Sequence, residues 1–194
     1  MKLSALLAAC LLATAVALPA AANQVTYVAV LNGPSEFPAN ASPGTGTAVV
    51  TIDSGLLTMH VQASFSGLLG NTTASHIHCC TAVPFTANAG VATQTPSFAG
   101  FPLGVMSGAY DNTFDMSLAS SYNAAFVTAH GGTVAGAFND LVAGLDGGNA
   151  YFNIHTQTVP GGEIRGFLTP VPEPGSLALL TTGLLVARRR LIKG

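Results

Sequence analysis

Three histidines carry the clearest chemical signal in this sequence of 194 residues. His76 and His78 lie two positions apart in residues 73–78, a segment with the composition of a strand. Side chains at positions i and i+2 of a strand share one face, so both imidazoles project together, close enough to bind one metal ion. His155 lies in a later predicted strand, residues 150–156. If the two strands are neighbours in the sheet, the three imidazoles converge.

Three imidazoles are a good ligand set for zinc or copper, so His76, His78 and His155 are candidate ligands for one of these ions. The sequence favours a structural network over this metal centre: the rings would hydrogen-bond to backbone groups or to the neighbouring strand and bind no ion. His130, beside two glycines in a predicted loop, is a further candidate ligand. His60 faces water in its predicted strand, and we expect no role for it.

Two adjacent cysteines, Cys79 and Cys80, follow His78 directly. One interpretation is a strained, redox-labile disulfide, because neighbouring Cα atoms are only about 3.8 Å apart. A second interpretation is a pair of thiolate ligands, which would favour Cu(I) or zinc. A third is disulfide bonding to other chains outside the cell. The sequence leaves all three open.

Arg165 is the only Lys or Arg between Asn23 and Thr169, where the chain has seven acidic residues. Glu163 and Arg165 lie on one face of a predicted strand, which indicates a structural ion pair, with Glu36 as the other possible partner of the arginine. The alternative role of Arg165 is to guide an anion toward a metal ion. An almost cation-free domain excludes nucleic-acid binding, because neutralising phosphates requires several Lys or Arg.

No motif of a common enzyme class is present. The sequence has no G-x-S-x-G element of a hydrolase and no glycine-rich phosphate loop between a strand and a helix. We therefore assign no catalytic and no organic cofactor-binding residue, and a non-enzymatic role is favoured.

The elements that must position the histidines form an all-β domain of short strands and glycine-rich turns. The predicted strands are residues 25–31, 46–52, 57–63, 73–78, 105–110, 113–118, 150–156 and 163–168. A hairpin turn is expected at Asp111-Asn112, and a second at residues 160–162. The side chains expected to face the core from strands 57–63 and 113–118 are those of Leu57, Met59, Val61, Ala63, Phe114, Met116 and Leu118.

One segment has a different period. Apolar residues recur at helical spacing from Val134 to Leu145, and Gly147-Gly148 then ends the pattern. The sequence therefore predicts a β-sandwich or Greek-key barrel with one short helix across one end.

Both ends of the chain have the composition of targeting segments. Lys2, the apolar residues 3–18 and the small residues 20–22 predict a signal peptide of residues 1–22. A β domain of residues 23–169 follows, and residues 170–194 form a C-terminal sorting segment. This segment consists of a Pro172-Glu173-Pro174 break, a short apolar run over residues 177–187, and Arg188-Arg189-Arg190.

The interior resembles the CHRD domain, named after chordin, over about Tyr27 to Leu168. The blocks that carry the resemblance are residues 31–38 (LNGPSEFP), 74–78 (ASHIH), 150–156 (AYFNIHT) and 160–166 (PGGEIRG). The resemblance implies an extracellular domain with an immunoglobulin-like β-barrel, a fold likened to copper/zinc superoxide dismutase. It implies no established enzymatic activity.

The C-terminal segment resembles the PEP-CTERM sorting signal of Gram-negative bacteria that make exopolysaccharide. This resemblance implies cleavage by an exosortase near Pro172-Glu173-Pro174, after a signal peptidase has removed the N-terminal peptide. The apolar run has about half the length of a stable span, which indicates transient insertion into the inner membrane. The arginines would stay on the cytoplasmic side. The destination would be the cell surface or the extracellular matrix.

Two functions follow as expectations. The first is a non-catalytic structural or adhesive role at the cell surface or in the exopolysaccharide matrix, with exopolysaccharide or matrix proteins as partners. The alternative is a copper- or zinc-binding protein that uses His76, His78 and His155, with superoxide-dismutase-like redox chemistry.

Overall fold

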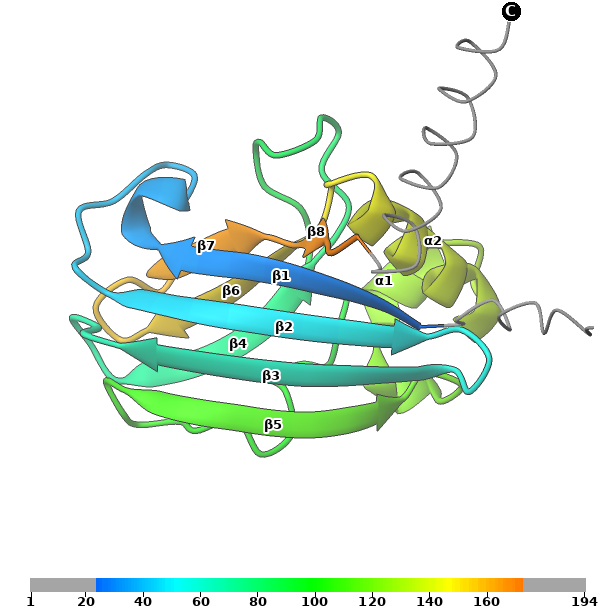
Figure 1. Cartoon of the computed structure of the whole chain (residues 1–194), viewed down its shortest axis with the longest axis horizontal. Coiled ribbons are helices and arrows are strands. Elements are labelled where there is room, and N and C mark those ends of the chain that lie inside the picture. Colours follow the sequence, from blue (N-terminus) through cyan, green and yellow to red (C-terminus); the bar gives the residue numbers. More distant parts are fainter. Residues whose placement is uncertain (1–23, 173–194) are drawn as a thin grey trace, which may run out of the picture.

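One antiparallel sheet contains all eight strands of the computed structural model, which describes residues 24–172. The strand order is β4-β6-β7-β1-β2-β3-β5, and the short β8 also pairs with β1. The strands are β1 (Gln24–Asn32), β2 (Thr45–Asp53), β3 (Thr58–Ser66), β4 (Thr72–His78), β5 (Gly108–Asp115), β6 (Tyr151–Thr156), β7 (Ile164–Phe167) and β8 (Thr169–Pro170). Figure 1 shows β1, β2, β3 and β5 side by side, with β4 and β6 behind them.

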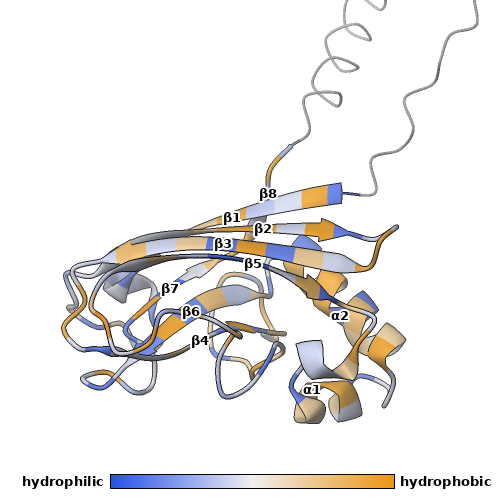
Figure 2. Cartoon of the chain, turned by 90° about the horizontal axis from the view of Figure 1, so that it is seen from below, coloured by the Kyte–Doolittle hydropathy of each residue, from blue (hydrophilic) through white to orange (hydrophobic). Residues whose placement is uncertain are grey.

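The sheet curls back on itself into a half-barrel. In Figure 2, β1, β2, β3 and β5 form one layer, and β4, β6 and β7 lie opposite. Phe98 joins the two layers, because its ring contacts Phe114 of β5 at 5.3 Å and Phe152 of β6 at 5.9 Å between ring centroids. Burial of these apolar side chains holds the layers together. The predicted all-β fold class is confirmed.

Alternation along the strands explains the half-barrel. Every second side chain of β1, β2 and β3 is buried in the core, and the side chains between them face outward. The fully or almost fully buried side chains of these strands include Tyr27, Leu31, Val50, Ile52, Met59 and Val61.

The α-helices lie at one end of the sheet (Figure 1). The long one, α2 (Val134–Asp146), was predicted; the Thr133 side chain caps its first turn by accepting a hydrogen bond from the Gly136 amide, and Gly147 ends it. A shorter helix, α1 (Ala124–Ala129), and two 3₁₀ turns, η1 (Gly33–Ser35) and η2 (Ala119–Ser121), were not predicted. The pattern of α2 was readable because four of its apolar side chains are buried.

Three local predictions are wrong. Residues 108–115 form the single strand β5, so the expected hairpin at Asp111-Asn112 does not exist, and Leu118 lies beyond the strand with 52% of its surface exposed. Asp111 is paired with Gln62 of β3 in the middle of the strand, and its carboxylate accepts hydrogen bonds from outward-facing side chains of β3. The sequence pattern does not show that this residue, of a type common in turns, lies within a strand. Leu57 lies in the β2–β3 turn with φ of 52° and is 38% exposed, so it is not a core residue.

The targeting segments lie almost wholly outside the described residues. The predicted signal peptide, the apolar run of residues 177–187, and the sorting residues Glu173, Pro174 and Arg188 to Arg190 are among them, so these assignments stay predictions. Within residues 24–172, no helix has the length and apolar character needed to span a membrane.

Candidate metal centre

The pairing of β4 with β6 brings the three predicted histidines together. In this antiparallel pair His76 lies opposite Asn153, His78 lies opposite Tyr151, and Ala74 lies opposite His155. Residues that face each other across a pair share one face of the sheet, so all three imidazoles project from the same side. One ring nitrogen from each histidine can be chosen such that all three atoms lie within 4.8 Å of one another. The neighbouring strands that the metal hypothesis required are present.

Each imidazole is held by one hydrogen bond to a backbone carbonyl. His76 Nε2 lies 2.8 Å from the Pro96 oxygen, and His78 Nδ1 lies 2.9 Å from the Ala89 oxygen. His155 Nδ1 lies 2.9 Å from the carbonyl oxygen of Pro160, in the β6–β7 turn. A carbonyl oxygen only accepts hydrogen bonds, so each of these ring nitrogens must carry the proton. This fixes the tautomer of all three rings and leaves a lone pair on the other nitrogen.

The three remaining nitrogens have no hydrogen-bond partner. They are His76 Nδ1, His78 Nε2 and His155 Nε2, and all three are shielded from water within the described part of the chain. Buried polar atoms in native proteins are normally paired, so three such atoms in one cluster call for an explanation.

Burial keeps the rings neutral. It lowers the pKa of His76 and of His78 from 6.5 to about 4, and lowers that of His155 as well. The carbonyl hydrogen bonds act in the opposite direction but are the weaker influence, and charge on neighbouring histidines lowers the pKa of His76 and His78 further. At neutral pH the unpartnered nitrogens therefore carry lone pairs, the form in which histidine binds a metal ion.

A stack of side chains supports His78 from one side. The His78 ring lies parallel to the Tyr151 ring with 4.8 Å between centroids, and the Arg165 guanidinium carbon lies 4.6 Å from the centroid of Tyr151. Arg165 also donates hydrogen bonds to the Ala87 oxygen and to Asn88 Oδ1, at 3.1 and 2.7 Å. The segment of residues 79–102 is thereby fastened across this face of the sheet.

The predicted ion pair of Glu163 with Arg165 is corrected. The carboxylate nearest to Arg165 Nε is that of Glu36, at 3.8 Å, and both side chains are buried. Glu163 lies just before β7, so strand alternation does not control its direction. Its carboxylate accepts hydrogen bonds from Ser42 Oγ, Thr156 Oγ1 and the Leu69 amide. Burial raises the pKa of Glu163, but these hydrogen bonds outweigh it and leave the pKa below its ordinary value.

Glu36 and Asn153 form a polar pair beside the histidines that the sequence did not single out as a site. Burial raises the pKa of the Glu36 carboxyl to about 7, against the opposing influences of Arg165 and Asn153. Glu36 Oε1 and Asn153 Oδ1 are buried and have no hydrogen-bond partner among the described residues. Strand alternation places Asn153 on the face of His155, but nothing in the sequence locates the Glu36 loop there.

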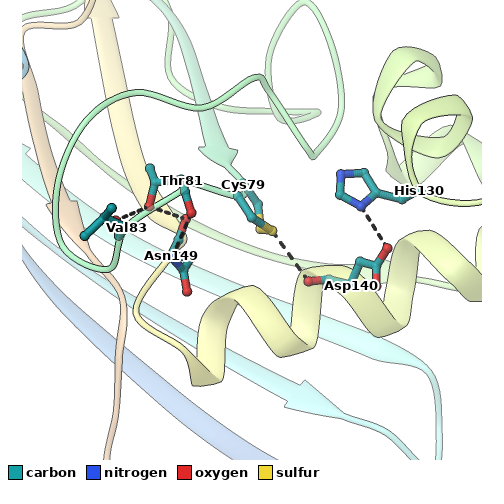
Figure 3. Close-up of a disulfide and its surroundings, with 7 residues drawn as sticks. Cys79, Thr81, Val83, His130, Asp140 and Asn149 are labelled. Carbon is teal, nitrogen blue, oxygen red and sulfur yellow. Dashed lines mark hydrogen bonds and ion pairs between the residues drawn. A yellow bond between two sulfur atoms is a disulfide. The ribbon is translucent and has the colours of Figure 1, made fainter.

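The two cysteines lie on the other side of β4. Cys79 and Cys80 are joined by a disulfide that faces α2, where Cys80 Sγ lies 3.6 Å from the Asp140 carbonyl oxygen (Figure 3). They do not belong to the cluster of ligand atoms, which within residues 24–172 contains the three histidines alone. His130 is also outside it: its Nδ1 lies 2.8 Å from the Asp140 carboxylate.

Comparison with known families gives two matches. The model described as CHRD domain matches residues 27–168, and the model described as PEP-CTERM protein-sorting motif matches residues 170–190. Both resemblances expected from the sequence are therefore confirmed. No curated protein and no solved structure matches the chain.

Proposed function

We propose that this chain, which belongs to the CHRD domain family, binds one copper or zinc ion through His76, His78 and His155 after export. The sorting motif implies processing by an exosortase and a location in the cell envelope or outside the cell. The family and the location do not include a metal ion; the geometry of the three imidazoles supports this part of the proposal.

The main support for this proposal is that three buried imidazole nitrogens converge, each with a lone pair that accepts no hydrogen bond from the described residues. In a structural network these nitrogens would accept hydrogen bonds, and each buried acceptor left without one costs about 1–3 kcal/mol. A cation at their centre satisfies all three at once. The opposite nitrogen of each ring is bonded to a backbone carbonyl. Such outer contacts fix the orientation of histidine ligands in known metal sites.

The ligand set indicates the type of ion. Imidazole suits zinc and copper, and both bind its nitrogen in sites of this composition. Zinc lies about 2.0–2.1 Å from a histidine nitrogen, so three nitrogens bound to one zinc ion lie roughly 3.4 Å from one another. The three candidate nitrogens lie within 4.8 Å of one another here, so the rings must move closer together when the ion binds. Three protein ligands leave one position for water or a small anion. Superoxide-dismutase-like redox chemistry at that position stays a prediction.

Metal stoichiometry of the exported protein tests this proposal. After incubation with zinc or Cu(II) and desalting, elemental analysis should find close to one ion per chain. His76→Ala and His155→Gln should reduce it to near zero while circular dichroism stays unchanged. His60→Ala is the matched control, because His60 lies on the exposed face, paired with Asp111, and should leave the stoichiometry at one. An intact protein that retains no metal would overturn the proposal.

The structural or adhesive role expected from the sequence depends on the destination of the protein alone. A metal-free result in the same experiment would leave it as the remaining candidate. Binding of the purified protein to exopolysaccharide from the producing cells would then test that role directly.

A further inference from the structure

The Cys79–Cys80 disulfide is open to solvent on one side only. Cys80 is exposed, whereas Cys79 is 3% exposed and belongs to the hydrophobic core. Cys80 lines an open surface hollow of about 430 Å³ together with His130, Asp140 and Asn149. Cys80 is therefore the cysteine that a small thiol or a flexible dithiol segment can approach from solvent, whereas Cys79 is covered.

On the inner side, α2 confines the sulfur atoms. A Cβ atom at Gly144 would collide with the sulfurs of both Cys79 and Cys80, so the helix backbone packs directly against the disulfide. When the bond between two sulfurs is broken, they must separate to van der Waals contact. The helix blocks one direction, so the separation is taken up on the open side, by rotation of the Cys80 side chain and by a shift of the backbone of residues 79 and 80.

The backbone on each side of the disulfide is fastened to other elements. Thr81 exchanges hydrogen bonds with Asn149, at 2.9 Å from its amide and 2.8 Å to its carbonyl. The Cys79 amide donates to the Gly90 oxygen at 3.1 Å. The residue before Gly90 is Ala89, whose carbonyl accepts the hydrogen bond of His78 Nδ1. A shift of Cys79 therefore affects His78 in two ways: through the peptide bond between the two residues, and through the Ala89–Gly90 segment that both of them contact.

From these contacts we propose that the Cys79–Cys80 disulfide is a thiol-exchange site, and that its reduction by a dithiol weakens metal binding at the histidines. This inference rests on the proposed metal centre. Oxidation locks residues 78–80 against α2 and keeps the His78 ring on the Ala89 carbonyl. Reduction releases residues 79 and 80, so the ring loses its fixed orientation.

The chemistry is ordinary thiol–disulfide exchange. A thiolate of the dithiol attacks the exposed Cys80 sulfur, the sulfur–sulfur bond breaks, and Cys79 leaves as a thiolate that takes up a proton. The second thiol of the reagent then attacks the sulfur of the reagent that is bound to Cys80 and releases the Cys80 thiol. Two electrons pass from the dithiol, which becomes a disulfide, to the two cysteines, which become thiols.

Zinc affinity of the full exported chain before and after reduction tests the inference. Dithiothreitol would be the reductant, removed by desalting without oxygen, and zinc the probe, because it has no redox chemistry that could reoxidise the thiols. Loss of contacts that orient a ligand typically reduces metal affinity by about 10–100-fold, and we expect a loss of this size, reversed by reoxidation.

Two variants keep the result from being ambiguous. Cys79→Ser/Cys80→Ser should bind zinc as weakly as the reduced protein and should not respond to dithiothreitol, which excludes zinc capture by free thiols. Gly144→Ala should weaken zinc binding without any change of redox state, since its methyl group would displace the sulfurs. Ala135→Ser, on an exposed position of the same helix and away from the hollow, is the matched control and should not change the affinity.

Equal zinc affinity of the oxidised and reduced proteins would overturn this inference and leave the metal centre intact. Tighter binding after reduction would overturn it as well. If neither form bound zinc, the proposed function and the inference would fall together. Hydrogen exchange in the metal-free protein adds a second readout: reduction should speed exchange of the amides at residues 89–92, and unchanged protection there would also overturn the coupling.

Discussion

The two halves of the sheet carry polar residues on their outward faces in the same alternation, but the surroundings of these residues differ. On β2, β3 and β5 the outward side chains meet water, as in the pairs Thr47–Ser64 and His60–Asp111. On β4, β6 and β7 the outward side chains include Arg165, which is 2% exposed, and the candidate metal ligands. The same strand pattern thus produces a solvated surface in one half and a buried polar layer in the other.

The difference comes from the segment of residues 79–102. Its backbone carbonyls at Ala87, Ala89 and Pro96 accept hydrogen bonds from side chains of β4 and β7. Water is excluded from this half, so polar interactions there are stronger and unpaired groups cost more than in the open half. Residues 79–102, called the cover from here on, therefore contribute more than the strands do to making an ordinary polar face a candidate site.

Removal of Arg165 should have the largest effect on stability. Arg165→Ala leaves Glu36 buried without its cation and removes the hydrogen bonds to residues 87 and 88, and loss of one partner of a buried pair typically costs about 3–5 kcal/mol. Urea unfolding of the metal-free protein measures this loss of stability. Asp111→Ala, on the open half, is the control and should leave the midpoint close to that of the wild type.

A double variant sharpens this result. Glu36→Gln/Arg165→Met removes both charges, so its cost should be smaller than the sum of the single changes. A loss for Arg165→Ala as small as that for Asp111→Ala would contradict the view that the cover makes this half different.

The alternation of side chains along single strands was predictable from the sequence. Alternation placed His60 in water and placed His76 and His78 on one face, and the structure agrees with both. The position of His155 followed once its strand was taken as a neighbour of residues 73–78. The predicted faces depend only on the alternation of polar and apolar residues along a strand, which can be seen in the sequence.

The cover could not be predicted. The atoms that hold the rings are backbone carbonyls, those of Ala89 and Pro96 in the cover and that of Pro160 in the β6–β7 turn. A carbonyl is present at every residue, so it leaves no signal in the sequence. The mistaken hairpin at Asp111-Asn112 has a related cause. Turn-forming residue types also occur on the solvated face of a strand, and only the partner strand distinguishes the two uses.

Acid should destabilise the metal-free protein through the covered half. His76 and His78 have a pKa of about 4 in the folded protein and 6.5 ordinarily, so between these pH values only the unfolded chain binds their protons. Their contribution to stability is complete above pH 6.5 and is lost as the pH falls toward 4. Each adds a slope of at most about 1.4 kcal/mol per pH unit. Urea unfolding between pH 4 and 8 measures it.

Glu36 acts in the opposite sense. Its pKa is raised from 4.5 to about 7, so the folded protein holds a proton that the unfolded chain has lost, and this contribution disappears as the pH rises through 7. Two histidines outweigh one carboxyl between pH 4.5 and 6.5, so the net slope remains positive. Glu36→Gln should steepen it, and His76→Gln should flatten it. Stability that falls as the pH rises from 4.5 to 6.5 would show that the covered rings are hydrated like exposed ones, because the contribution of Glu36 would then act alone.

The smallest effect is expected at the histidine of the open half. His60 Nε2 lies 2.8 Å from the Asp111 carboxylate, with both side chains substantially exposed, so solvent screens their attraction. A double-mutant cycle with His60→Gln and Asp111→Asn should show a small coupling at low salt. That coupling should vanish near 1 M salt, where the screening length falls to about 3 Å. If the coupling survived high salt, the open face would be shielded from water as well, and the difference between the two halves would no longer explain why only one of them gathers a candidate metal centre.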